Sequence, residues 1–271
     1  MFPKQLAILF TFEPLNKVRI DLNSSKTDQL RLPNIPLHLS KLIGLASFAF
    51  FVVHQSPVDA EPNECSDPLF LVDATHRDLA VSVCEMALRI RDDLKECGLS
   101  QTKLITIEIL NRVEHPFGNC LAYFDCPYDL VRITKPGMYG PLTTEDPIYS
   151  KFPDEIILRS LLTHELTHAL VVHTAYPKTV DIVDQEYIAA AMEIELMEPQ
   201  WRAVYVDLAE LDLERAPSER LIDIWTYSFA PRLFAVNAWR HFKLPENGCN
   251  LVRQLVSGEL SYSKPIRPEL R

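Results

Sequence analysis

The chain has 271 residues, of which 47% are hydrophobic and 24% are charged, a composition typical of a folded globular protein. Its formal net charge is −10 and its lysines and arginines form no cluster, which argues against nucleic acid as a partner. The phosphate-binding motifs GxGxxG and GxxxxGK[ST] do not occur in the sequence, so the common nucleotide-dependent enzymes are also disfavoured.

The longest apolar run, residues 42–53, follows Lys41 near the N-terminus. A membrane-spanning helix needs about 20 apolar residues, whereas a run of this length is typical of the apolar region of a signal peptide. Val58-Asp59-Ala60 supplies small residues for a signal peptidase, so we expect cleavage after Ala60. The alternatives are a buried core helix or a membrane anchor. The signal peptide predicts an exported protein, periplasmic or extracellular, with no stable membrane span after cleavage.

Residues 1–37 are longer than an ordinary charged region before a signal peptide. Either the true start lies downstream of Met1, or the segment is an extension without regular structure. We treat residues 1–60 as a leader and residues 61–271 as one domain. Without the six basic and four acidic residues of the leader, this domain has a net charge of −12.

All six cysteines lie in the proposed mature chain. An even number of cysteines after an export signal is typical of disulfides formed in an oxidising compartment, although six cysteines allow many pairings. We expect Cys120 to pair with Cys126, because they flank a short segment that resembles a turn. Buried free thiols in a cytosolic protein are the alternative. The candidates are Cys65, Cys84, Cys97, Cys120, Cys126 and Cys249.

The first half of the mature chain predicts a helix followed by a small, mainly antiparallel sheet. Residues 77–96 space their apolar side chains by three and four, which indicates an amphipathic helix, and Gly98 ends it. Alternating β-branched residues predict a first strand, and two shorter strands follow it. The expected strands span residues 103–110, 119–124 and 130–134.

The second half predicts helices only. A proline-rich loop, residues 135–153, separates it from the sheet. The first expected helix begins at Pro153 or Asp154 and runs to His173. Two more are expected at residues 184–197 and 199–214. A further helical stretch starts at Pro217 and is interrupted by Pro231, and the last helix spans residues 248–256. The mature chain therefore reads as a single α+β domain.

The helix from Pro153 carries the sequence His164-Glu165-Leu166-Thr167-His168. Residues four apart on a helix lie on one face, so the two imidazoles can bind one metal ion. Glu165 projects to the side, where it can reach a water on that ion without binding the ion itself. The alternative is a pair of solvated histidines on an ordinary helix.

A catalytic zinc needs a third protein ligand and one open position. His173 does not fit, because the helix between it and His168 has no glycine turn to fold back. Glu186 fits better, since it lies in the first turn of the next helix, although acids are favoured there in any protein. The reserve candidates are Asp181, Asp184 and Glu193.

His164-Glu165-Leu166-Thr167-His168 followed by Glu186 resembles the gluzincin branch of the zincin metallopeptidases. The pair of motifs is also similar to small secreted bacterial HExxH proteins, in which the segment 185–189 would match. The resemblance covers residues 77–200 and implies a zincin-like fold, in which a metal helix is followed by a glutamate helix and a C-terminal helical part. It implies zinc as the cofactor, His164, His168 and Glu186 as the ligands, and Glu165 as the catalytic base.

The sequence departs from this family at two places. Many gluzincins carry an acid four residues after the glutamate ligand to orient an imidazole, but Ala190 stands there; either Glu193 takes that role or the ligand assignment is wrong. The spacing also assigns no residue to stabilise the oxyanion. The candidates are Tyr205, Tyr227 and His241, although such side chains more often serve packing.

These residues predict zinc-dependent hydrolysis of peptide bonds, in which Glu165 takes a proton from the metal-activated water and passes it to the leaving amine. The substrate would be a peptide or protein that adds itself along a sheet edge, and residues 118–124 resemble such an edge loosely; Asn119, Ala122 and Tyr123 are the candidates to contact it. A secreted zinc-binding or structural protein with a non-catalytic HExxH helix is one alternative. A hydrolase of non-peptide amides is the other.

Overall fold

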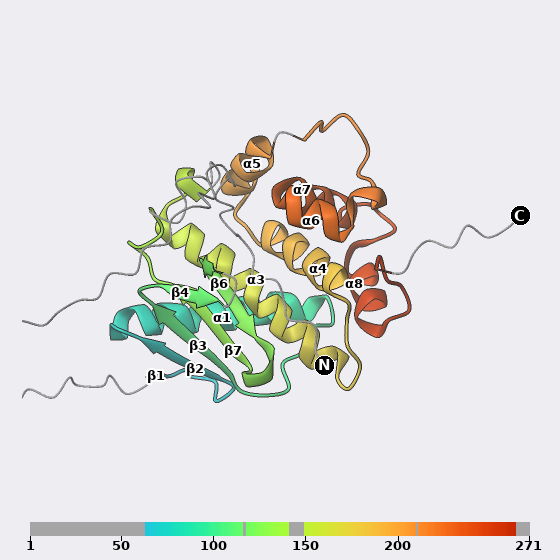
Figure 1. The fold of residues 1–271 in the computed structure, drawn as a ribbon. Helices are drawn as coiled ribbons and strands as arrows, with labels where there is room; N and C mark the ends of the chain where they lie inside the picture. The colour runs from blue at the N-terminus through green and yellow to red at the C-terminus, as the bar shows by residue number, and fades with distance from the viewer. Residues whose placement is uncertain (1–62, 116–117, 141–148, 210, 264–271) are drawn as a thin grey trace, which may run out of the picture. The chain divides into compact units, whose positions relative to one another are not determined.

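The computed structural model describes residues 63–115, 118–140, 149–209 and 211–263 (Figure 1). The described residues form a mixed α+β fold, as the sequence predicted, with the strands in the first half and most of the helices in the second. The signal-peptide interpretation of residues 42–53 and the cleavage after Ala60 lie outside the described residues. No described helix combines the length and the apolar character needed to cross a membrane.

A five-stranded sheet forms the first half, in the order β1-β2-β3-β7-β6. On one face of the sheet, apolar side chains at paired positions of neighbouring strands lie next to one another and are buried. Examples are Val72, Ile107, Val131 and Phe124. The opposite face is polar, and there Arg132 binds Glu108 at 2.8 Å. The strands are β1 (Asn63–Glu64), β2 (Phe70–Ala74), β3 (Ile105–Leu110), β6 (Ala122–Asp125) and β7 (Leu130–Thr134), while β4 (Val113–His115) and β5 (Gly118–Cys120) form a separate hairpin.

The sheet is not mainly antiparallel, which corrects the expectation from the sequence. The three central strands β2, β3 and β7 are parallel, and only the edge strands β1 and β6 run antiparallel to their neighbours. The cause is β2, a strand that the sequence analysis missed. Because β2 precedes helix α1 (Arg77–Glu96), this helix becomes a crossover that returns the chain to β3 in the same direction.

The second half consists of helices that pack around α3 and α4. In Figure 1, α3 lies between the sheet on one side and α4, α6 and α7 on the other. With partners on both sides, α3 and α4 are buried almost all round. The helices are α3 (Asp154–Ala175), α4 (Ile182–Glu195), α5 (Pro199–Leu208), α6 (Ile224–Phe229), α7 (Pro231–Phe242) and α8 (Gly248–Ser257).

The largest differences from the predicted extents are at α5 and in the stretch from Pro217. Helix α5 ends at Leu208 rather than at Glu214. The stretch from Pro217 is divided, because the Asp223 side chain caps a new helix, α6, by accepting from the backbone of Trp225 and Thr226. The predicted interruption at Pro231 is confirmed, because α6 ends at Phe229 and Pro231 begins α7, where a proline needs no backbone hydrogen bond.

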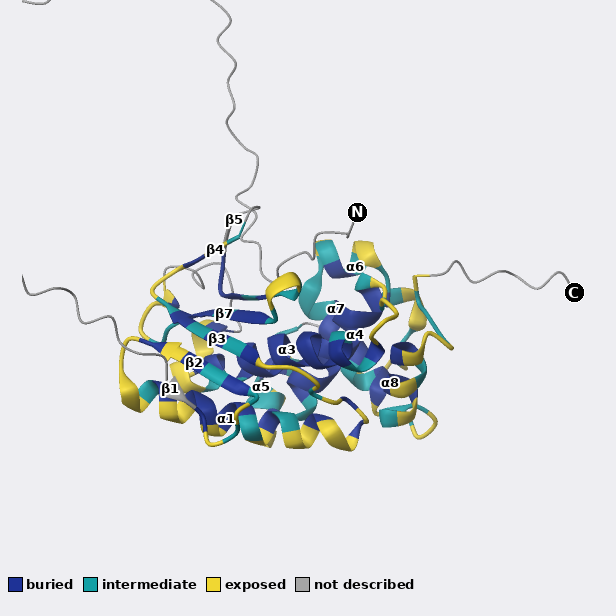
Figure 2. Ribbon diagram, turned by 90° about the horizontal axis from the view of Figure 1, so that it is seen from below, coloured by how far each residue is buried: buried dark blue, intermediate teal, exposed yellow. Residues whose placement is uncertain are grey.

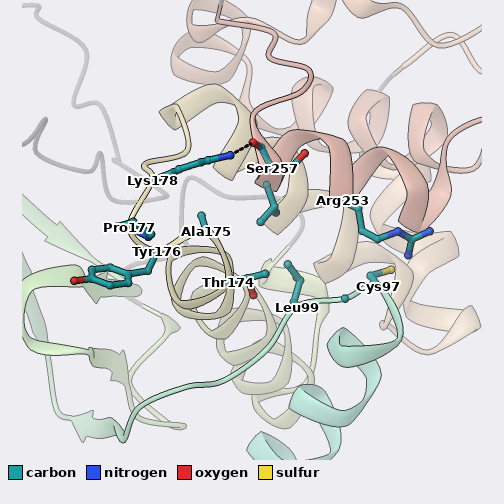
Figure 3. Close-up of a pocket in the computed structure, with 11 residues that line it drawn as sticks. Cys97, Leu99, Thr174, Ala175, Tyr176, Pro177, Lys178, Arg253 and Ser257 are labelled. Atoms are coloured by element: carbon teal, nitrogen blue, oxygen red, sulfur yellow. Dashed lines mark hydrogen bonds between the residues drawn. The ribbon is translucent and has the colours of Figure 1, made fainter.

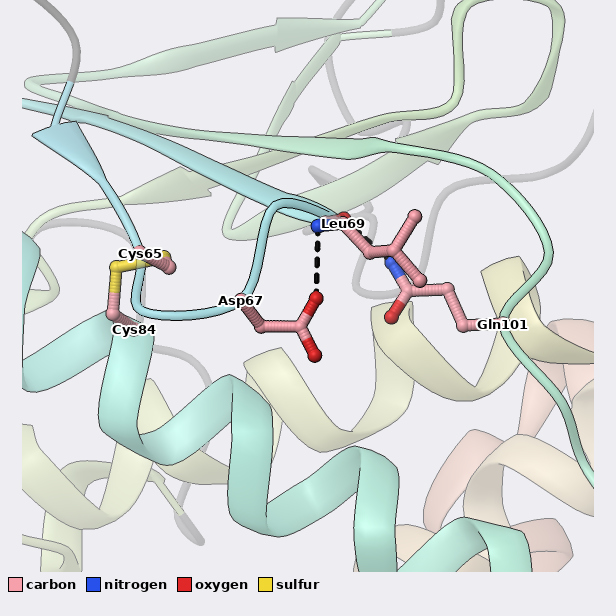
Figure 4. Close-up of a disulfide and its surroundings, with 5 residues drawn as sticks. All are labelled: Cys65, Asp67, Leu69, Cys84 and Gln101. Atoms are coloured by element: carbon pink, nitrogen blue, oxygen red, sulfur yellow. Dashed lines mark hydrogen bonds between the residues drawn. A yellow bond between two sulfur atoms is a disulfide. The ribbon is translucent and has the colours of Figure 1, made fainter.

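Two disulfides join segments of this domain. Cys65 bonds to Cys84 on α1 beside a turn in which Asp67 accepts from the Leu69 backbone (Figure 4). The second disulfide joins Cys97 to Cys249, which are 152 residues apart in the sequence and tie the end of α1 to α8. Both lie in the proposed mature chain.

The expected pairing of Cys120 with Cys126 is wrong, because both are free thiols. Strand β6 separates them, and an extended strand advances about 3.3 Å per residue. Their Cα atoms are therefore held well beyond the roughly 7 Å that a disulfide can span. The short segment between them is a strand of the sheet and not a turn.

Candidate metal centre

Helix α3 places the side chains of His164 and His168 next to each other in the protein interior. Both are about 95% buried, with exposed fractions of 4% and 5%. Their Nε2 atoms are 3.0 Å apart, as the spacing of four residues on a helix predicted.

Helix α4 brings the third group. The short connection 176–181 turns the chain back, so that α4 packs along α3. Glu186 is 1% exposed, and its carboxylate oxygens lie 3.5 Å from the Nε2 atoms of His164 and His168. The three ligand atoms of these residues, the ligand triad, lie within 4.8 Å of one another.

The ligand triad fits a zinc ion. Tetrahedral ligands at about 2.0–2.1 Å from zinc lie about 3.4 Å from one another, and the separations here are 3.0 and 3.5 Å. The Oε2 atom of Glu186 is buried and has no hydrogen-bond partner within the described part of the chain. A buried carboxylate oxygen without a partner is costly, and a cation between the three side chains would satisfy it.

Glu193, one of the reserve candidates, binds the outer side of His164. Its Oε2 atom lies 2.8 Å from Nδ1 of His164, so Nδ1–H donates to the carboxylate and Nε2 is the ring nitrogen directed at the centre of the triad. Tyr149 donates to Oε1 of Glu193 at 3.0 Å, and Ser160 donates to the same oxygen. Glu193 thus occupies the role left vacant by Ala190.

The sequence analysis did not anticipate Tyr149 or Ser160. A signal for Ser160 was present, since it precedes His164 by four residues and therefore lies on the same face of α3. No local signal pointed to Tyr149, which comes from a short 3₁₀ turn before the helix.

The buried charges of the centre shift one another's pKa values. Burial lowers the pKa of His164, but the carboxylates of Glu186 and Glu193 outweigh it and raise that pKa to about 10. Burial raises the pKa of Glu186, yet His168 and His164 lower it to about 2. The ligand triad without metal is therefore a buried arrangement of opposite charges.

Glu165 lies beside the triad and is 3% exposed. Burial raises its pKa, although His164 and His168 act in the opposite direction. Burial raises the pKa of the Cys120 thiol to about 12, and the negative charge of Glu165 contributes to this rise. The end of β5 therefore lies near the metal helix.

Of the three oxyanion candidates, Tyr227 reaches the centre. Burial, the charges of Glu186 and Glu165 and a hydrogen bond to Glu186 raise the pKa of the Tyr227 hydroxyl well above its usual value. Tyr205 instead packs its ring on Phe152, at 6.3 Å between centroids.

His241 lies in a different environment. Its Nδ1 atom is 3.0 Å from the Tyr187 hydroxyl, and its ring packs against Tyr262. Burial lowers the pKa of His241.

His173, which the sequence analysis rejected as a ligand, and the remaining reserve residues have other partners. His173 binds Asp129 through Nε2 at 2.9 Å, so it is a core histidine and not a ligand, as its position on the helix indicated. Asp184 accepts from the backbone of Tyr262 at 2.8 Å, and Asp181 accepts from the Ser261 hydroxyl. Both acids hold the end of the described chain against α4.

The predicted substrate-binding segment lies at a sheet edge. Strand β6 is the edge strand beside β7, while Asn119 lies on β5, where it pairs with Glu114. Ala122 is buried, and Tyr123 accepts a hydrogen bond from Arg132 on the polar face of the sheet. The backbone of β6 therefore lies at the sheet edge, but the Tyr123 side chain is hydrogen-bonded to Arg132 within the sheet.

A cavity of about 350 Å³ in the described structure does not contain the ligand triad. It lies at the C-terminal end of α3, between the residues from Thr174 to Lys178, Leu99 and the helix α8 (Figure 3). Lys178 spans it by donating to the Ser257 carbonyl at 3.0 Å. The ligand triad is instead buried between α3 and α4.

Residues 70–265 match the model of a protein family described as a family of unknown function, DUF6639. The chain belongs to this family. The DUF6639 region begins at β2 and includes the ligand triad, Glu193, Tyr227 and the helices α5–α8. It therefore extends well beyond residues 77–200, the part that resembles gluzincins. No curated protein and no solved structure matches the chain.

Proposed function

We propose that this protein is a zinc-dependent hydrolase of peptide bonds. The observation that carries the proposal is the convergence of His164, His168 and Glu186, buried and spaced like the ligands of one ion, with Glu165 beside them. Two imidazoles and one carboxylate leave a fourth position of a tetrahedral zinc for water or substrate, which is the ligand set of catalytic rather than structural sites. When bound, zinc would act as a Lewis acid and lower the pKa of a water.

The side chains around the triad can perform the proton transfers of hydrolysis. Glu165 can accept the proton of the water that adds to the carbonyl carbon and return it to the leaving amine as the C–N bond breaks. Burial raises its pKa, which makes the carboxylate a stronger proton acceptor than an exposed glutamate. The Tyr227 hydroxyl stays protonated, because its pKa is raised, and can donate a hydrogen bond to the carbonyl oxygen as charge develops there.

The sheet edge and the disulfides support the substrate class and the location. Among the described strands, β6 pairs with β7 alone, so an extended peptide could add to its other edge by backbone hydrogen bonds. The two disulfides in the mature chain favour an exported protein, because such bonds persist in oxidising compartments.

The depth of burial supports a second candidate, a zinc-binding structural protein without turnover. Glu165 and the ligand triad are each at most 5% exposed, as expected for a metal that holds α3 and α4 together. In that case Glu165 is a buried carboxylate without a chemical role. Removing its charge would then leave the function unchanged.

The decisive experiment measures zinc and hydrolysis together in the Glu165→Gln and Glu186→Ala variants. We expect Glu165→Gln to keep one zinc per chain but to lose about 100- to 10,000-fold in kcat on unfolded casein, the range of general acid–base catalysis. Glu186→Ala should lose zinc. The matched control is Asp181→Ala. Asp181 lies just before α4 and accepts a hydrogen bond from Ser261, and this variant should keep both zinc and activity.

Two outcomes would contradict the proposal. Unchanged kcat in Glu165→Gln would exclude the mechanism, and full zinc content in Glu186→Ala would mean that the third ligand lies elsewhere. Zinc bound to the wild type without hydrolysis of casein, but with cleavage of cell-wall amides, would favour the non-peptide hydrolase.

A further inference from the structure

Two buried hydroxyl groups bind the same carboxylate oxygen behind the metal centre. Tyr149 donates to Oε1 of Glu193 at 3.0 Å, and Ser160 donates to that same atom. The other oxygen, Oε2, accepts from Nδ1 of His164 at 2.8 Å. All four side chains are at most 5% exposed, and Figure 2 shows α3 and α4, which carry three of them, as largely buried helices. We call Tyr149 and Ser160 the hydroxyl pair.

The two hydroxyl groups reach Glu193 from different segments. Ser160 stands on α3, four residues before His164. Tyr149 comes from the 3₁₀ turn Tyr149–Lys151 that precedes this helix, and Glu193 comes from α4. Three segments therefore meet at one carboxylate, although only α3 and α4 supply ligands to the triad.

The ring of Tyr149 is held by an aromatic cluster. It packs edge-to-face on Phe152, with 6.2 Å between centroids and an interplanar angle of 87°. Phe152 in turn packs on Trp201 of α5 at 5.6 Å and on Tyr205 of the same helix at 6.3 Å. The cluster therefore fixes the point from which the Tyr149 hydroxyl donates to Glu193.

Two donors on one oxygen restrict the rotation of a carboxylate. The terminal torsion of a glutamate has a broad distribution when nothing constrains it. With Oε1 of Glu193 bound by both hydroxyl groups, Oε2 stays on the side of His164 and accepts from its Nδ1. The opposite nitrogen of that ring, Nε2, then lies 3.0 Å from Nε2 of His168. Partners of this kind set the tautomer and the ring orientation of a metal-binding histidine.

We propose that Tyr149 and Ser160 are positioning residues of the metal centre, which act through Glu193 to fix the imidazole of His164 for metal binding. This inference rests on the proposed function for the presence of zinc, but it does not depend on turnover. The 3₁₀ turn before α3 is then part of the metal centre although it supplies no ligand. A tyrosine that served packing alone would need only its ring, and loss of its hydroxyl would leave the bound ion unaffected.

The test measures metal affinity and coordination geometry in variants that each lose one hydroxyl. Tyr149→Phe keeps the ring on Phe152, and Ser160→Ala removes the other donor to the same oxygen. Each should lower zinc affinity about 3- to 10-fold, measured by competition with a chelating dye, which is less than the roughly 10- to 100-fold of a residue in direct contact with a ligand. Cobalt(II) bound in place of zinc should show a shifted visible absorption spectrum in both variants, because this spectrum depends on the coordination geometry.

The matched control is Tyr139→Phe. Tyr139 is 1% exposed, and its hydroxyl lies near Asp154 at the start of α3, where burial and the Asp154 charge raise its pKa. This variant loses an equally buried hydroxyl outside the metal centre. It should change neither the zinc affinity nor the cobalt spectrum.

A double-mutant cycle tests whether the hydroxyl pair acts through Glu193. Tyr149→Phe combined with Glu193→Gln should bind zinc no more weakly than Glu193→Gln alone, because the connection to His164 is already broken. Losses that multiply in the double variant would overturn the inference, since Tyr149 would then act by another route.

The remaining outcomes separate this inference from the proposed function. Unchanged zinc affinity and an unchanged cobalt spectrum in both single variants, with only a lower midpoint of urea unfolding, would overturn the inference in favour of packing. A loss confined to one variant would overturn the role of the other residue. The expected losses of zinc affinity, in a wild type that cleaves no casein, would support the hydroxyl pair and contradict the hydrolase. A wild type that binds neither zinc nor cobalt would overturn both.

Discussion

His168 and His173 stand on one buried helix, yet their surroundings differ. At the C-terminal end of α3, Nε2 of His173 binds Asp129 at 2.9 Å, and Nδ1 accepts from the Thr102 backbone at 3.4 Å. In the middle of the helix, Nε2 of His168 faces another ring nitrogen and a carboxylate, and its Nδ1 has no partner within the described residues.

The difference shows what separates a core histidine from a candidate ligand. Burial is the same at both positions, with exposed fractions of 4% for His173 and 5% for His168. The distinction lies in the partners. Other segments supply the hydrogen bonds of His173, whereas Nε2 of His168 faces Nε2 of His164 and the Glu186 carboxylate, and its Nδ1 has no partner within the described residues. A bound metal is expected where buried polar atoms lack hydrogen-bond partners in this way.

The largest expected effect comes from removing each histidine in turn. His168→Ala should lower zinc affinity by more than 100-fold, which exceeds the roughly 10- to 100-fold of a residue that only orients a ligand. His173→Ala should leave zinc affinity unchanged but cost about 1–3 kcal/mol of unfolding free energy, because it removes the buried partner of Asp129 and leaves that carboxylate only its ion pair with Lys103. Competition with a chelating dye measures the zinc affinity, and urea unfolding measures the free energy of unfolding. Equal zinc affinity in both variants would remove the distinction between these histidines.

A smaller effect is expected from the carboxylate behind His164. Glu193 accepts hydrogen bonds from His164, Tyr149 and Ser160. Glu193→Gln replaces one of the accepting oxygens by an amide group that can only donate. We expect zinc affinity to fall by about 10- to 100-fold, with the stoichiometry unchanged at saturation. The control is Glu195→Gln on the same helix, where the carboxylate binds Trp239 and Lys243 instead. If both variants bind zinc equally well, Glu193 does not orient His164.

The smallest effect concerns a carboxylate far from either histidine. Asp67 accepts from Arg91 at 2.5 Å and from the Leu69 backbone at 2.9 Å, and these bonds lower the pKa of Asp67. A carboxyl whose pKa is lower in the folded state stabilises the protein above its unfolded pKa of about 3.9, and this stabilisation is lost as the pH falls through the folded pKa. Asp67→Asn should therefore cost about 0.5–1 kcal/mol at pH 7.

The pH dependence provides the check on Asp67. In urea unfolding at a series of pH values, the difference between wild type and Asp67→Asn should vanish at the acid end, while zinc affinity stays unchanged. Asp92→Asn, whose carboxylate is more exposed and lies 3.3 Å from Arg91, should show a smaller difference. A constant difference at every pH would mean that the ion pair with Arg91 contributes nothing.

The sequence alone determined the features that depend on near neighbours. Helix α1 matches its predicted range of residues 77–96, and His164 and His168 share a face, because both follow from the repeat of the helix. The choice of Glu186 over Asp184 also came from its place in the sequence, and the distances to both imidazoles agree with it.

Only the tertiary structure decided the features that join distant segments. The parallel centre of the sheet, the pairing of Cys97 with Cys249 and the position of Tyr227 against Glu186 each bring together residues far apart in the chain. Glu193 became the partner of His164 because α4 packs along α3 in one particular register. Local repeat patterns carry no information on such contacts, since these depend on how whole helices and strands bury their apolar faces against one another.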